Sequence, residues 1–170
     1  MSAAVVTPLS LAEFNAVSES DAHALSGSCL DIERRVLEVG SGRPYPDWES
    51  LRARASDSAE VITWDEVAGA LARHPRIGER ANGEPGDVAL SASEQAGVVS
   101  SDVAALAAGN AAYEDRFGYV YLICATGLSG EQMLAALHER LTHDDQAERL
   151  VVMDELRRIA ALRLAKAISR

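Results

Sequence analysis

His74 is the residue of this sequence whose type and position best suit acid/base chemistry. It ends an apolar run and precedes Pro75, which forces the residue before it out of a helical conformation. A histidine held by a rigid turn at a helix end can be aimed into a pocket, and its ordinary pKa suits proton transfer near neutrality. A histidine in that place can also serve structure alone, by satisfying the last carbonyls of the helix.

Glu94 is a second candidate, because Ser91 and Glu94 form the Ser-x-x-Glu pattern that caps a helix N-terminus. Capping alone accounts for the pattern. However, a helix N-terminus also offers backbone N–H donors and a positive dipole end to a carboxylate or carbonyl oxygen. Gln95 adds an amide that both donates and accepts hydrogen bonds. Both interpretations of this segment stay open.

Arg163 falls on the apolar face of the last predicted helix, seven residues after Leu156 and four before Ala167. An arginine on a core-facing stripe needs a carboxylate or a bound anion, because an unpaired buried charge is costly. Its partner is either an internal Asp or Glu or an anionic substrate, unless the side chain extends to the edge of the core.

The other residues capable of metal or thiol chemistry show no site pattern. His138 and His143 are five residues apart, whereas the zinc motif HExxH places its histidines four apart on one helix face. We therefore expect no metal site. Cys29 and Cys124 form no CxxC pair, which favours reduced thiols over a disulfide.

Composition excludes several classes of partner. The 170 residues carry a formal net charge of −10, with 16 Lys and Arg against 26 Asp and Glu. This acidity argues against nucleic acid or an anionic membrane as a partner. No apolar run reaches the roughly 20 residues that span a bilayer, and no signal peptide is recognisable, so we expect a cytoplasmic protein.

The elements that must position these residues are predicted to be helices. Apolar spacing predicts helices over residues 11–19 and 21–39, and a long one from Ser91 to about Tyr113. Residues 78–89 are predicted to form a loop, and the conformation of 117–125 is left open. Capping patterns predict further helix starts at Asp47, Thr63 (running to about Arg73), Ser129, and Asp144 or Asp145. The prediction is one all-α domain over residues 1–170, a bundle of about seven or eight helices.

Four blocks in this order resemble one known family, the 2-oxo-4-hydroxy-4-carboxy-5-ureidoimidazoline (OHCU) decarboxylases. The blocks are His74-Pro75-Arg76-Ile77-Gly78, Leu90-Ser91-x-x-Glu94-Gln95, Asn110-x-x-Tyr113-x-x-Arg116-Phe117-Gly118 and Ile159-Ala160-x-Leu162-Arg163-Leu164. Gly42-Arg43-Pro44-Tyr45 also matches. The chain departs from the family at Tyr119-Val120-Tyr121, where Phe-Pro-Phe is usual.

The resemblance implies an all-α homodimer that converts OHCU into (S)-allantoin and CO2 without a cofactor. It implies that His74 is the acid/base residue and Glu94 its catalytic companion. The residues that it places against the substrate are Pro75, Ser91, Ala92, Ser93, Glu94, Gln95, Tyr121, Leu122, Ile123, Cys124, Ala125 and Arg163. Two alternatives are an acid/base enzyme acting on another ureide or hydantoin, and a non-catalytic helical interaction module.

Overall fold

Side-chain caps begin several helices of the computed structural model, which describes residues 8–79, 92–99 and 102–169. Ser10, Ser18, Asp47 and Ser129 each accept a hydrogen bond from a backbone N–H three residues further on. These bonds satisfy donors that have no partner inside the helix. The chain is mostly helical, so the all-α prediction is confirmed.

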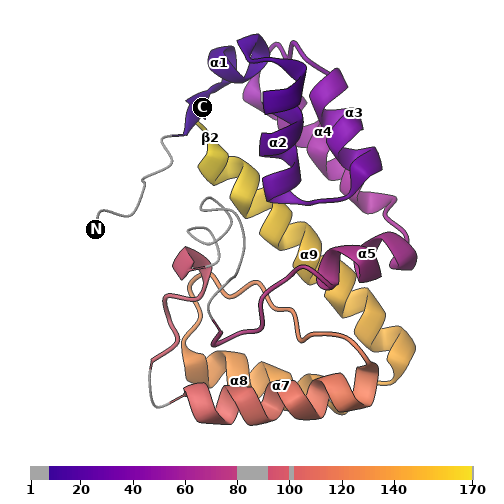
Figure 1. Ribbon diagram of the computed structural model, residues 1–170, viewed down its shortest axis with the longest axis vertical. Coiled ribbons are helices and arrows are strands. Elements are labelled where there is room, and N and C mark those ends of the chain that lie inside the picture. Colours follow the sequence, from indigo (N-terminus) through magenta and orange to yellow (C-terminus); the bar gives the residue numbers. More distant parts are fainter. Residues whose placement is uncertain (1–7, 80–91, 100–101, 170) are drawn as a thin grey trace. The chain divides into compact units, whose positions relative to one another are not determined.

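Figure 1 shows the order of the elements along the chain. They are β1 (Leu9–Ser10), α1 (Leu11–Ala16), α2 (Glu19–Cys29), α3 (Glu33–Ser41), α4 (Trp48–Glu60), α5 (Trp64–Leu71), α7 (Val103–Phe117), α8 (Gly130–Arg140), α9 (Asp145–Ala167) and β2 (Ile168–Ser169).

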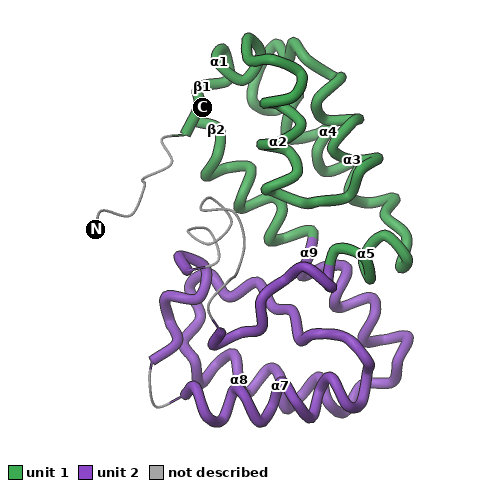
Figure 2. The backbone as a smooth tube through the Cα atoms, in the orientation of Figure 1, with its two compact units in different colours: residues 1–70, 157–170 green, residues 71–156 purple. Residues whose placement is uncertain are grey.

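The chain divides into two compact units, coloured separately in Figure 2. The first unit comprises Met1–Ala70 together with Arg157–Arg170, and the second comprises Leu71–Leu156. Helix α9 contributes its first half to the second unit and its second half to the first.

In the first unit, α3 packs against both α2 and α4. Its two terminal strands form a short parallel pair in which Leu9 faces Ile168. The buried core of this unit consists of Phe14, Ala22, Cys29, Val39, Tyr45, Leu51, Ala55, Leu164 and Ile168.

In the second unit, α7 and α8 lie side by side (Figure 1). Gly109 permits this packing, because a Cβ added there would stand only 3.0 Å from the side chain of Leu137. The buried core of this unit consists of Ile77, Leu106, Tyr113, Tyr121, Ile123, Ala125, Met133 and Leu137.

The three helices predicted from apolar spacing are wrong in extent. The helix predicted over residues 11–19 ends at Ala16, because Val17 is extended and a new helix begins at Glu19. The helix predicted over residues 21–39 is two helices, because Leu30 and Ile32 are extended and both bury their side chains. Where the structure describes the helix predicted from Ser91 to about Tyr113, residues 92–94 form a helical turn, residues 95–99 are not helical, and α7 starts at Val103. Ser91 itself lies outside the described residues, as does most of the loop predicted at 78–89.

The capping predictions at Asp47, Thr63, Ser129 and Asp144 are confirmed, whereas the one at Ser91 falls outside the described residues. Asp47 caps α4, Thr63 and Glu66 exchange the two bonds of a capping box, and Ser129 does the same with Gln132. Asp144 accepts a bond from the N–H of Ala147 at the start of α9. None of the helices in the described ranges is both long and apolar enough to cross a membrane.

Candidate active site

The His74 loop follows directly after α5. The N–H of His74 donates to the carbonyl of Leu71 at 3.0 Å, closing a turn as the helix ends. Helix α5 thus ends at Leu71, two residues before the predicted end, because Pro75 prevents its continuation. Gly78 closes the loop with a positive φ of 87°, a conformation that side chains disfavour. The local sequence therefore determines the shape of the loop.

Two amide side chains hold the loop from outside it. Asn110 of α7 is buried and donates from Nδ2 to the carbonyl of Ile77 at 2.8 Å. The N–H of Gly78 donates to Oε1 of Gln95 at 2.8 Å. Since Gln95 is the neighbour of Glu94, this second bond brings the two predicted catalytic segments together.

An ion pair fixes the outer side of the same loop. The Arg76 guanidinium binds the Glu114 carboxylate through two nitrogens, one of them Nη2 at 2.8 Å from Oε2. Its hydrogen bond to Arg76 lowers the pKa of Glu114 below the ordinary value. Because both side chains are partly exposed, this pair orients the loop more than it stabilises the fold.

The predicted catalytic residues are partly accessible. His74, Pro75, Glu94 and Gln95 are all half-buried, and the helical turn that precedes Gln95 exposes Ala92 and Ser93. Partial burial leaves a group within reach of a ligand while the protein restricts its orientation.

The predicted substrate-contacting strip, residues 121–125, is a segment that belongs to neither a helix nor a strand. The N–H of Cys124 donates to Oε2 of Glu155 at 2.6 Å, and the carbonyl of Leu122 accepts from Arg140 at 2.6 Å. The Tyr121 hydroxyl donates to the carbonyl of Met133 at 3.1 Å. Side chains of α8 and α9 thus satisfy backbone groups of this segment that a neighbouring strand would satisfy in a sheet.

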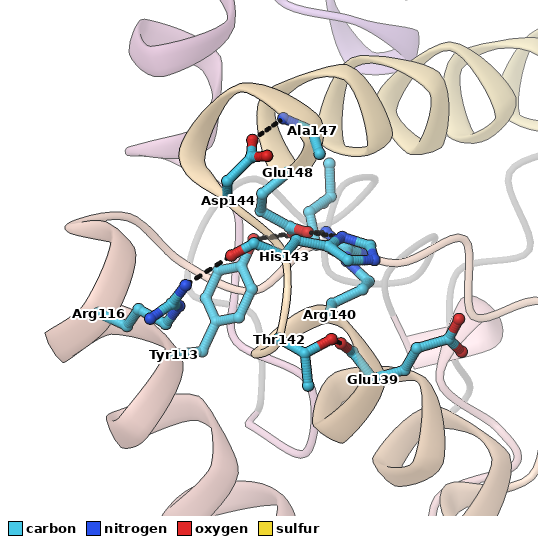
Figure 3. A network of polar contacts seen from close by, with 10 residues as sticks. Tyr113, Arg116, Glu139, Arg140, Thr142, His143, Asp144, Ala147 and Glu148 are labelled. Atoms are coloured by element: carbon cyan, nitrogen blue, oxygen red, sulfur yellow. Dashed lines mark hydrogen bonds and ion pairs between the residues drawn. The ribbon is translucent and has the colours of Figure 1, made fainter.

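Through its bond to Leu122, Arg140 connects this strip to a buried polar network, which Figure 3 shows. Arg140 binds Oε1 of Glu148 through Nε at 2.8 Å and Nη2 at 2.6 Å, and both residues are buried. Tyr113 donates its hydroxyl to Oε1, and Nδ1 of His143 lies 2.9 Å from Oε2. Burial, with the bond to Glu148, raises the pKa of Tyr113, so its phenol stays protonated and donates.

The network was missed in the sequence, although a signal for it exists. Arg140 continues the buried stripe of Met133 and Leu137 along α8, and Glu148 begins the stripe of Val152 and Leu156 along α9. A charged residue on a core-facing stripe needs a partner of opposite charge, as was argued for Arg163. An arginine and a glutamate on two such stripes therefore indicate a buried ion pair.

The inward orientation predicted for Arg163 is confirmed. The residue is only 7% exposed, and its Nη1 donates to the carbonyl of Ser28 at 3.2 Å. Arg163 belongs to the first unit, whereas the other described site candidates belong to the second. A role for Arg163 in substrate binding stays a prediction.

Neither metal chemistry nor a disulfide is indicated within the described ranges. No three His, Cys, Asp or Glu side chains cluster there as a metal site would require. His143 is instead engaged with Glu148, and no disulfide joins Cys29 to Cys124.

Comparison with known proteins gives one consistent family. Residues 15–165 match the sequence model of the family described as OHCU decarboxylase. The chain is 31% identical to the OHCU decarboxylase of Amia calva, over 74% of this chain and 75% of that protein. It is 33% identical to the uric acid degradation bifunctional protein TTL of Arabidopsis thaliana, over 83% of this chain but only 45% of that protein.

A solved structure has the same fold. The crystal structure of an OHCU decarboxylase in the presence of (S)-allantoin superposes with a TM-score of 0.70, covering 88% of this chain and 97% of that one. Its sequence identity is 23%, so this likeness concerns the fold.

Proposed function

Because the chain belongs to the OHCU decarboxylase family, we propose that it converts OHCU into (S)-allantoin and CO2 in urate degradation. The observation that carries this proposal is the family match over residues 15–165, which includes the His74 loop, the Glu94 segment and Arg163. The 31% identity to the Amia calva enzyme, over three quarters of its length, supports the same reaction.

The reaction breaks the bond between ring carbon C4 and its carboxylate. CO2 leaves, and the electron pair enters the conjugated C=N and carbonyl groups of the ring. One proton is then added to a ring carbon from one face, which decides the stereochemistry of the product. Because the substrate itself accepts the electrons, the protein needs only to position it, complement its charge and transfer protons. We therefore expect no cofactor.

His74 is the proposed acid/base residue and Glu94 its companion. His74 stands on a loop held by Gln95, Asn110 and the Arg76–Glu114 pair, so its position is well restricted. Such preorganisation is what a stereospecific proton transfer requires.

The substrate-binding residues are proposed from the family resemblance. With Oε1 engaged by Gly78, the NH2 group of Gln95 is the part that would face a substrate oxygen. Along residues 121–125, the N–H of Cys124 already has a partner, so ligand contacts would come from the neighbouring backbone groups. The remaining proposed residues are Pro75, Ser91, Ala92, Ser93, Glu94 and Arg163.

Three properties of the protein as a whole are part of the proposal and rest on the resemblance and the composition. They are a homodimeric assembly, a cytoplasmic location, and the action of residues 1–170 as one functional domain. The net charge of −10 supports a small-molecule substrate and no nucleic-acid partner.

Circular dichroism at the allantoin band tests the proposal, with urate, uricase and the preceding hydrolase generating OHCU in situ. The wild-type protein should produce the (S)-allantoin signal rapidly. His74→Ala should lower the rate by about 10²- to 10⁴-fold, the usual contribution of general acid/base catalysis. His138→Ala is the matched control, because His138 is an exposed histidine of α8 that is not among the proposed site residues.

The other outcomes each refute a definite part of the proposal. A signal no faster than spontaneous racemic decay would refute the decarboxylase activity, and assays on other ureides and hydantoins would then follow. Inactivity on all of them would favour the interaction module. Fast turnover by His74→Ala would keep the reaction and refute the role given to His74.

A further inference from the structure

Arg35 is a buried cation of the first unit, and it has no acidic partner among the residues that the structure describes. It lies in α3 and is only 1% exposed. Its Nη1 donates to the carbonyl of Ser26 at a long 3.4 Å, and its buried Nε has no hydrogen-bond partner in the described ranges. Burial lowers the pKa of the guanidinium, but an arginine side chain stays charged in a protein. This charge therefore lacks the compensation that burial requires.

Comparison with other arginines shows that this situation is unusual in the molecule. The buried Arg140 binds the Glu148 carboxylate at 2.6 Å, and the half-exposed Arg34 pairs with both Glu38 and Glu66. No carboxylate of the described residues lies within ion-pair distance of Arg35. Because a buried charge needs compensation, we expect this cation to bind an anion that lies outside the described residues.

Arg35 lines a cavity of about 240 Å³ that lies wholly within the first unit. Its apolar walls are formed by α4 and the C-terminal half of α9, through Trp48, Ala55, Ala59, Ala160 and Leu164. At about 30 Å³ of liquid volume per water, the space equals roughly eight waters, enough for a small organic molecule. Arg163 does not line the cavity, so this space is distinct from that proposed substrate contact.

The other charged residues at this cavity already have partners. Arg157 donates to the carbonyls of Ala59 and Glu60, the last two residues of α4, and Arg52 pairs with Glu49 at 2.7 Å. Glu60 is the acidic residue of the lining, and it is exposed. The guanidinium of Arg35 is thus the group of this cavity that still requires a counter-ion.

We propose that this cavity binds a small organic carboxylate, with Arg35 as the group that binds its charge. The planar fork of a guanidinium matches a carboxylate with two parallel hydrogen bonds, and the alanine and leucine walls suit an apolar body. The apolar walls do not suit inorganic phosphate, whose oxygens all need donors. Because the protein carries a net charge of −10, binding depends on this local cation.

Thermal unfolding with benzoate as the probe tests the proposal at constant ionic strength, which is kept with sodium chloride. Benzoate should raise the Tm of the wild-type protein saturably, by about 5 °C or more at a hundredfold excess over Kd. Benzamide has the same shape without the charge and should have little effect. In a Trp64→Phe background, Trp48 at the cavity wall should report the same titration by fluorescence.

Three substitutions separate a binding role of Arg35 from a structural one. Arg35→Met should be at least as stable as wild type without benzoate and should lose the benzoate-induced shift. Arg54→Met removes the same charge from an exposed position of α4 and should keep the shift. Arg35→Lys, which keeps the charge without the fork, should weaken binding at least tenfold and serves if Arg35→Met does not fold.

Three results would overturn the proposal. They are the absence of a saturable shift for wild type, an equal shift with benzamide, and a shift that survives unchanged in Arg35→Met or Arg35→Lys. None of these assays measures decarboxylation, so their outcome is independent of the proposed function.

Discussion

Replacing Glu148 by glutamine should unfold the second unit far more easily than a single isosteric change normally does. Glu148 is fully buried and receives two bonds from Arg140, one from Tyr113 and one contact from His143. Glutamine keeps the shape and one acceptor oxygen but removes the charge. Arg140, only 5% exposed, then loses the charge of its counter-ion, and its two bonds to Oε1 become bonds to a neutral amide oxygen.

The expected magnitude follows from the burial of both partners. Breaking a buried ion pair by neutralising one member costs about 3–5 kcal/mol, because the other charge stays buried and uncompensated. A whole domain is stable by only about 5–15 kcal/mol, so this change removes a large share of it. In a chain of this size, each kcal/mol lowers the Tm by about 2–4 °C, which gives a fall of roughly 6–20 °C.

Urea unfolding followed by far-ultraviolet circular dichroism measures this change. The midpoint should fall while the m-value stays constant, since the unfolded chain is the same. Glu139→Gln is the matched control, because Glu139 is an exposed glutamate on α8, and its effect should stay within about 0.5 kcal/mol. The double variant Glu148→Gln with Arg140→Met should recover more than half of the loss, because both charges are then gone.

If Glu148→Gln lowered the free energy of unfolding by less than about 1 kcal/mol, the reasoning would be refuted, because an exposed ion pair contributes no more than that. A double variant no more stable than Glu148→Gln would also refute it. In that case the shape of the network, and not the charge on Arg140, would carry the stability.

Two further predictions concern the His74 loop. Gln95→Leu removes the oxygen that accepts from the Gly78 N–H, and it should lower kcat in the decarboxylation assay more than tenfold. Gln95→Glu keeps an acceptor oxygen and should have a higher kcat than Gln95→Leu. Equal kcat values for the two variants would contradict the idea that this hydrogen bond holds the His74 loop in place. Arg76→Gln should make unfolding easier at pH 7 and make no difference in strong acid, because Arg76 lowers the pKa of Glu114 below 4.5. A carboxyl group whose pKa is lowered by folding contributes fully to the free energy of unfolding above its ordinary pKa. This contribution disappears as the pH falls through the pKa of the folded state. The urea midpoints of wild type and Arg76→Gln should therefore converge below pH 4.5, and a difference that stays constant with pH would contradict the prediction.

Helix starts were predictable from the sequence because a cap is a local interaction. Asp47 binds the N–H of Ser50, and Thr63 exchanges bonds with Glu66, in each case over three residues. Such bonds require only the neighbouring chain, so their residue types and spacing suffice to identify them.

Helix extents were less predictable, because apolar periodicity does not distinguish a helix from a buried connection. Leu30 and Ile32 match the helical spacing of their neighbours, but in the structure they bury their side chains from extended backbone. The packing of α3 against α2 requires a turn between them, and that packing is a tertiary event.

By itself, the sequence determined the fold class, the family and the identity of His74, Glu94 and Arg163 as candidates, since these depend on residue type, order and period. Only the tertiary structure decided what holds them. The bond from Asn110 to Ile77 spans 33 residues, that from Gly78 to Gln95 spans 17, and that from Tyr113 to Glu148 spans 35. A buried polar group must find a partner somewhere, but its own position in the chain does not say which one. For the same reason, a sequence pattern can mark Arg35 or Arg140 as inward-facing, and only the folded chain shows that Arg140 has its carboxylate while Arg35 has none among the described residues.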